Sequence, residues 1–111
     1  MKIDYRYSVL VSTDEDLKLN QVLKSISQFA EVWSIGIETL ISIPDNSRTP
    51  NKIGQIDLSF CATQEEAGLF RFTLCHIYRN MCVKYTNIRF RLIDAEGAIL
   101  DDSLIDKQSQ G

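Results

Sequence analysis

The 111-residue chain has few of the residues and motifs that mark catalytic or cofactor-binding proteins. It contains one histidine, two prolines and three cysteines, and its five glycines stand singly along the chain. It has no G-x-x-x-x-G-K-[ST] or G-x-G-x-x-G loop to hold a phosphate, and no G-x-S-x-G turn to carry a nucleophilic serine. These absences exclude the known Gly-rich nucleotide loops and serine hydrolases of that type.

The thiols and the lone imidazole give no catalytic or metal-binding pattern. Cys61, Cys75 and Cys82 are odd in number and have no C-x-x-C spacing, which argues against a disulfide framework and a zinc ribbon. His76 follows Cys75 directly, but neighbouring side chains on a helix point about 100° apart. We therefore expect free thiols, a partly exposed helix histidine, no metal and no cofactor.

Charge and hydropathy limit the partners and the compartment. The net charge is −3 and the sequence pI is near 5.0, whereas binding to a phosphate backbone favours clustered Lys and Arg with a basic balance. The start, from Met1 to Arg6, is charged and does not resemble a signal peptide, and no apolar run reaches membrane-spanning length. We predict a cytoplasmic protein without membrane binding, and the acidic balance places nucleic-acid binding third among the functions considered. A secreted effector with a non-classical signal would look the same.

Hydrophobic periodicity predicts alternating strands and helices. Period-two alternation indicates strands over 3–11, 35–43, 55–62 and 88–93, the last followed by a turn at 94–97 and a short return strand at 98–100. The turn-forming residues of 44–51 predict a loop. Two helical segments begin with the spacing of a capping box, Ser12 with Glu15 and Thr63 with Glu66, and the second runs to about Asn80.

This order, β-α-β-β-α-β followed by a hairpin strand, predicts an α+β domain of the ferredoxin-like, or split βαβ, kind. In that arrangement two helices cover one face of an antiparallel sheet, and a C-terminal β-hairpin extends it. We place the single domain at residues 1–100 and a polar C-terminal tail at 101–111, because 111 residues suit one domain.

The uncovered face of such a sheet offers the first candidate site. Its positions on the first and third strands are Asp4, Arg6, Ser8, Gln55, Asp57 and Ser59. None is aromatic, which argues against RNA-binding domains of this topology, because these stack bases there. We also expect Arg6, Arg89 and Arg91 to cluster on this face, either as a weak anion-binding site or in cross-strand pairs with Asp4 and Asp57.

The second helix offers another candidate surface, because it is more apolar than one buried face requires. Leu69, Phe72 and Cys75 flank its core-facing stripe, where a surface helix is normally polar. Either the C-terminal segment from Ile99–Leu100 to Leu104–Ile105 folds back over them, or another chain does. We name Leu69 and Phe72 as candidate partner-binding residues.

Two functions therefore stay open. The first is a small non-catalytic protein-interaction module, such as an adaptor, an immunity or antitoxin-like inhibitor or a regulatory subunit, which binds another protein or itself. The second is a dimeric ferredoxin-like protein or small enzyme that holds an anionic ligand with Arg6, Arg89 and Arg91. The absence of a catalytic constellation favours the first, and fold analogy alone supports the second.

Overall fold

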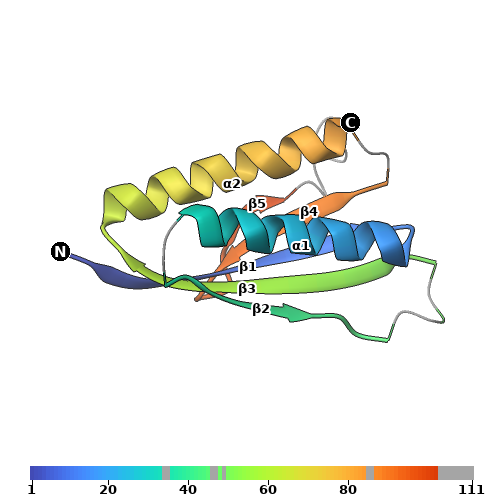
Figure 1. Ribbon diagram of the computed structural model, residues 1–111, viewed down its shortest axis with the longest axis horizontal. Helices are drawn as coiled ribbons and strands as arrows, with labels where there is room; N and C mark the ends of the chain where they lie inside the picture. Colours follow the sequence, from blue (N-terminus) through green and yellow to red (C-terminus); the bar gives the residue numbers. More distant parts are fainter. Residues whose placement is uncertain (34–35, 46–47, 49, 85–86, 103–111) are drawn as a thin grey trace.

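The computed structural model describes residues 1–33, 36–45, 48, 50–84 and 87–102, and it shows an α+β domain with both helices on one side of a sheet (Figure 1). Along the chain, the elements are β1 (Ile3–Thr13), α1 (Asp16–Trp33), β2 (Glu38–Ser42), β3 (Lys52–Ala62), α2 (Gln64–Lys84), β4 (Arg89–Asp94) and β5 (Ile99–Asp102). The expected two-layer arrangement of an antiparallel sheet under two helices is confirmed.

β1 is the central strand of the five-stranded sheet, whose order is β2-β3-β1-β4-β5. It pairs with β3 along its whole length, from Ile3 opposite Ala62 to Thr13 opposite Lys52. On its other side it pairs with β4 between Tyr7 and Ser12, so the first and fourth strands are neighbours. All four strand pairs are antiparallel, and β5 extends the sheet beyond β4.

The alternation along β1 and β3 assigns their side chains to the two faces as expected. Tyr7, Val9 and Val11 are buried under the helices, and so are Ile56, Leu58 and Phe60 from β3. The opposite face carries Arg6, Ser8 and Asp57, and neither helix of the described residues covers it (Figure 1). A slip of one residue would have exchanged the two faces. The register therefore keeps the aromatic side chains of these two strands off the open face.

Of the two predicted capping boxes, the second is confirmed. The Thr63 hydroxyl accepts from the Glu66 N–H at 3.2 Å, and the Glu66 carboxylate accepts from the Thr63 N–H at 2.9 Å. These two bonds satisfy donors that the first turn of a helix cannot pair internally. They hold the start of α2 directly behind the last residue of β3.

The first predicted capping box is wrong. Ser12 lies within β1, opposite Ile53 and Arg89, and the strand continues to the buried Thr13. Pairing on both sides of β1 outweighs the local capping preference. Asp14 instead lies between β1 and α1, where its carboxylate accepts from Lys18 and Asn87. These bonds lower the pKa of Asp14 to about 2, with the Lys18 bond as the largest cause.

A cluster of aromatic rings joins α2 to the sheet and to α1. The ring of Phe70, which is fully buried, lies 4.8 Å from that of Phe60, 5.6 Å from Phe29 and 5.7 Å from Trp33, measured between centroids. The ring of Tyr7, from the central strand, also stacks on that of Phe70, with 6.4 Å between the centroids. Phe70 therefore fixes the rotation of α2 about its axis.

The turn between β4 and β5 is built by one aspartate and one glycine. Oδ1 of Asp94 accepts from the backbone N–H groups of Glu96 and Ala98, at 3.0 and 2.9 Å. Gly97 adopts a φ of 85°, which is the region that favours glycine. The predicted turn at 94–97 is thus confirmed, and it holds β5 against β4.

Several predicted boundaries shift. α2 continues four residues past Asn80, to Lys84, and β3 begins at Lys52 rather than Gln55. β5 runs to Asp102, which takes two residues from the predicted tail. Residues 103–111, including Leu104 and Ile105, lie outside the described residues, as do Ile35 and parts of the predicted loop. Among the helices in the described ranges, none has the length and apolar character needed to cross a membrane.

We predict that two phenylalanines two positions apart on α2 differ sharply in their effect on stability. Phe70→Ala should lower the free energy of unfolding by about 3–5 kcal/mol, because it removes a ring at the centre of the core. Phe72→Ala should lower it by less than about 0.5 kcal/mol, because its ring is exposed. Urea unfolding of both variants measures the difference, and equal losses would contradict this view of the core.

Candidate functional site

The solvent-facing side of α2 carries large apolar side chains at its centre. Ala67, Phe70, Leu74 and Tyr78 define the buried side of the helix. With about 100° between successive residues, the opposite side carries Glu65, Leu69, Phe72, His76, Arg79 and Val83, which we call the α2 stripe. Leu69 is 57% exposed and Phe72 is 70% exposed, so the structure places both predicted partner-binding residues in solvent.

The described part of the C-terminal segment does not cover these two residues. Leu100 turns to the helix side of the sheet and packs against the core, whereas Ile99 remains 52% exposed. Leu104 and Ile105, which the sequence offered as a cover, lie outside the described residues. Within the ranges that the structure describes, the apolar part of the α2 stripe is therefore open.

Charges of opposite sign lie on the two sides of the apolar centre of the α2 stripe. Glu65 lies in the first turn of α2, and Arg79 lies in its second half. Glu66, the neighbour of Glu65, is engaged in the capping box with Thr63. Glu65 is the carboxylate that faces solvent in line with Leu69 and Phe72. The stripe therefore runs from an acidic end through an apolar centre to a basic half.

The three arginines of the predicted anion site share the open face of the sheet but do not form one cluster. Arg89 and Arg91 lie on β4, opposite Ser12 and Leu10 of β1. Arg6 lies opposite Ser59 of β3, beyond Tyr7, where the pairing of β1 with β4 ends. Arg6 and Leu10 are four residues apart, which places Arg6 about 13 Å along the strand from the row of Arg91.

Asp57, one of the two carboxylates predicted to pair across strands on this face, bonds to other residues. Oδ1 of Asp57 accepts from the Ser8 hydroxyl at 2.6 Å and from the Gln55 amide at 2.7 Å. The guanidinium of Arg89 donates to the carbonyl of Ile88, the preceding residue, at 3.3 Å. Exposed aliphatic side chains such as Leu40 and Ile53 alternate with these polar groups. The open face is consequently a mixed polar and apolar surface.

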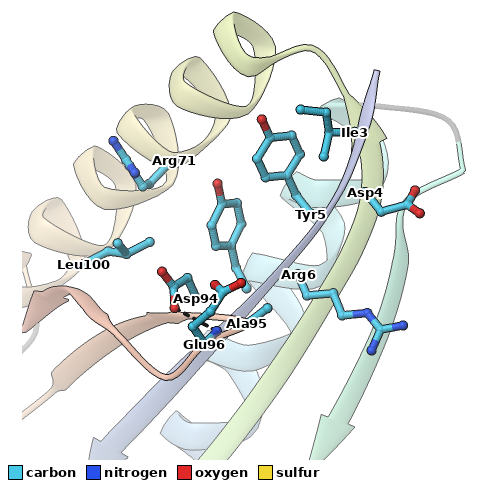
Figure 2. Close-up of a pocket in the computed structure, with 10 residues that line it drawn as sticks. Ile3, Asp4, Tyr5, Arg6, Arg71, Asp94, Ala95, Glu96 and Leu100 are labelled. Atoms are coloured by element: carbon cyan, nitrogen blue, oxygen red, sulfur yellow. Dashed lines mark hydrogen bonds between the residues drawn. The ribbon is translucent and has the colours of Figure 1, made fainter. Parts of the chain in front are cut away.

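A cavity that the sequence did not indicate lies on the helix side of the sheet. It has a volume of about 330 Å³ and lies between α2, the first half of β1 and the β4–β5 turn (Figure 2). We call it the notch; the side chains that face it are Tyr5, Tyr7, Arg71, Asp94, Glu96 and Leu100. Figure 2 shows that Asp4 and Arg6, although they border it, point to the other side of β1.

The notch contains a buried phenol. Tyr7 is only 6% exposed, and its ring packs on Tyr5, Phe60 and Phe70. Burial raises the pKa of Tyr7 above its ordinary value of 10.0; the nearby Arg71 charge opposes this rise, and Tyr5 and Asp94 add to it. Both Arg71 and Asp94 thus act on the Tyr7 hydroxyl from the walls of the notch.

The position of Arg71 is the one sequence feature that indicates a polar site beside the core. Arg71 follows directly after the buried Phe70 and so lies on the flank of α2 beside the core, where a charged group needs a polar neighbour or water. The inward alternation of Tyr5 and Tyr7 supplies that polar neighbourhood, but only the fold reveals that Arg71, two tyrosines and the β4–β5 turn share one cavity.

The thiols and the imidazole do not converge. Cys61 is exposed on β3, Cys75 and Cys82 are partly buried on α2, and His76 is exposed on the α2 stripe. The Cys82 thiol lies 3.4 Å from the carbonyl of Ile88, which accepts its hydrogen bond. Among the described residues, no three side chains of His, Cys, Asp or Glu are arranged to hold a metal ion.

We predict that two substitutions in the notch move the pKa of Tyr7 in opposite directions. Arg71→Gln should raise it, because the neighbouring positive charge is lost, and Asp94→Asn should lower it. A raised pKa means that the neutral phenol favours the fold; this contribution is complete below 10.0 and disappears as the pH rises through the folded pKa. Ultraviolet titration of tyrosinate, with Tyr7→Phe to assign the signal, measures both shifts. Shifts of the same sign would contradict the geometry.

Comparison with known proteins shows a likeness of fold only. No protein-family model and no curated protein matches the sequence. Among solved structures, the chain is similar to "De novo designed protein Foldit4", with a TM-score of 0.65 and 10% sequence identity over 84% of this chain and 97% of that chain. The likeness supports an α+β fold with two helices on one face of a sheet, and at this identity it carries no information about activity.

Proposed function

We propose that this chain is a non-catalytic protein-interaction module that associates through the α2 stripe, with a second copy of the chain as its partner. The observation that carries the proposal is the exposure of Leu69 and Phe72 at the centre of the solvent side of α2. We also propose that the first six elements form a ferredoxin-like domain, with β5 added at the edge of β4; the β-α-β-β-α-β order supports this classification.

The energetic argument concerns the exposed apolar area. A helix packed on a core is normally polar on its solvent side, and large exposed apolar patches commonly mark contact surfaces. Complete burial of a leucine or phenylalanine side chain contributes about 1.5–3 kcal/mol. Burial of Leu69 and Phe72 in a contact with a partner would therefore contribute a favourable free energy that the monomer does not have.

The charges along the α2 stripe support a second copy as the partner. When two α2 helices lie antiparallel about a two-fold axis at Phe72, Glu65 of one copy faces Arg79 of the other, because each is seven residues from Phe72. Seven residues are about two helical turns, so all three lie on one side of the helix. This pairing is isologous and also sets the helix dipoles in opposition.

The pairing of one helix with its copy is small, and this determines the strength that we expect. A helix of 21 residues is about 32 Å long, and one helix pair falls at the low end of the area that stable interfaces bury. We therefore propose a weak, concentration-dependent dimer. Such a dimer suits a regulatory subunit or adaptor, and an immunity or antitoxin-like inhibitor that exchanges its own copy for a target.

The alternative function, anion binding on the open sheet face, has less support. It requires Arg6, Arg89 and Arg91 to act together, and the strand register separates Arg6 from the other two. An acidic chain with no aromatic side chain on the open face of β1 and β3 also gives little support to nucleic-acid binding. We propose a cytoplasmic protein on the same sequence grounds as before.

We predict that Phe72→Asp abolishes dimerisation while leaving the fold intact. The matched control is Leu17→Asp, since Leu17 lies on α1 and is 68% exposed, almost as exposed as Phe72 at 70%. Sedimentation equilibrium over a range of concentrations should show dimers for the natural chain and for Leu17→Asp, and monomers for Phe72→Asp. A natural chain that stays monomeric throughout, or equal effects of both variants, would overturn the proposal.

A charge exchange tests the antiparallel register. Glu65→Arg alone and Arg79→Glu alone should each weaken the dimer several-fold, because like charges then face each other across the two-fold axis. The double variant should restore dimerisation close to that of the natural chain. Circular dichroism controls for the loss of a favourable charge at the start of α2. Additive weakening in the double variant would exclude this register.

A further inference from the structure

We propose that the notch binds a small zwitterion with the chemistry of a free α-amino acid. Its carboxylate would lie against the guanidinium of Arg71 and the hydroxyls of Tyr5 and Tyr7, and its ammonium group against the carboxylates of Glu96 and Asp94. The proposal is independent of dimerisation, because the notch lies on the flank of α2 beside the core and not on the α2 stripe.

The first argument is a phenol that is anchored in the core and borders the notch. Tyr7 is 6% exposed as a residue, and its side chain lines the notch, so the phenol is anchored in the core and borders the cavity. A ligand carboxylate in the notch would accept from the Tyr7 hydroxyl, which makes Tyr7 a binding group and not only a core residue.

The second argument is the separation of charge across the notch. Arg71 projects from α2 on one wall, and Asp94 and Glu96 lie on the β4–β5 turn at the other (Figure 2). Among the described residues, no ion pair joins Arg71 to either carboxylate. The notch therefore presents a donor wall and an acceptor wall at the same time.

This arrangement discriminates between classes of ligand. A simple anion at Arg71 also meets the negative charges of Asp94 and Glu96, and a simple cation at these carboxylates meets Arg71. A zwitterion satisfies both walls, since charge-assisted hydrogen bonds are roughly twice as strong as neutral ones. Oδ1 of Asp94 already accepts two backbone N–H groups, so Glu96 is the more available carboxylate.

Size and rigidity agree with a small molecule. A volume of about 330 Å³ is at the lower end of the range for small-molecule sites. Tyr7 is held by the rings of Phe60 and Phe70, and the turn is held by Asp94 and Gly97, so both walls are largely pre-formed. Leu100 and the Tyr5 ring supply apolar contact for a ligand side chain.

The test is calorimetric titration of the full chain with each common α-amino acid in turn. Two modified forms of any amino acid that binds serve as probes: the N-acetyl form, which lacks the ammonium charge, and the amide, which lacks the carboxylate. We expect saturable binding of at least one free amino acid, and at least about tenfold weaker binding of both modified forms.

Matched variants assign the two walls. Arg71→Gln and Tyr7→Phe should weaken binding of the free amino acid at least about tenfold and about fivefold respectively. Glu96→Gln should weaken the free amino acid but not the N-acetyl form. Arg6→Gln is the control, because Arg6 lies next to the notch but points to the other face of the sheet, and it should change binding less than twofold. Urea unfolding verifies that each variant remains folded.

Three results would overturn the proposal. The first is the absence of binding by any amino acid at millimolar concentration. The second is binding of acetate or inorganic phosphate as tightly as the best amino acid, which would identify a simple anion site. The third is equal weakening by Arg71→Gln and Arg6→Gln, which would identify a long-range charge effect instead of contact in the notch.

Discussion

The packing of Phe70 against four other aromatic rings determines much of what this molecule presents to solvent. The ring lies among Tyr7 and Phe60 of the sheet and Phe29 and Trp33 of α1. With Phe70 held there, α2 has one possible rotation about its axis. Leu69 and Phe72 must then face away from the sheet, and Arg71 must lie on the flank beside Tyr7. The core contact thus places both candidate sites, although neither is part of the core.

The two candidate sites use different physical means. The α2 stripe depends on apolar area and on charges of opposite sign along one helix, which suits a large, flat partner. The notch depends on a small number of polar groups around a rigid phenol, which suits a small ligand. The open face of the sheet has neither property, because its aliphatic side chains are interrupted by polar ones such as Ser8 and Asp57, which bond to each other.

Local sequence patterns predicted most of the fold, and long-range pairing accounts for what they missed. Strict alternation identified β1 and β3 and their two faces, and Thr63 with Glu66 marked the start of α2. The helix cap predicted at Ser12 was wrong because pairing of β1 on both sides outweighs the local preference of serine for a cap. The notch could not be predicted from the sequence, because Tyr7, Arg71 and Asp94 are distant along the chain and only the tertiary fold brings them to one cavity. The separation of Arg6 from Arg89 and Arg91 depends on the point at which β1 and β4 stop pairing. No local sequence pattern encodes that point.

The edges of the sheet have a consequence for the behaviour of the protein at high concentration. In the described part of the chain, β2 and β5 are the two edge strands, and each has a strand neighbour on one side only; β5 ends in two aspartates, whereas β2 carries aliphatic residues. An uncovered edge strand with exposed Leu40 and Ile41 is a template on which another extended chain can add. The five-residue length of β2, and the proline at position 44 just beyond it, limit how far such a strand can grow. Aggregation of this protein, where it occurs, should therefore begin at β2 and be suppressed by a charge at position 40.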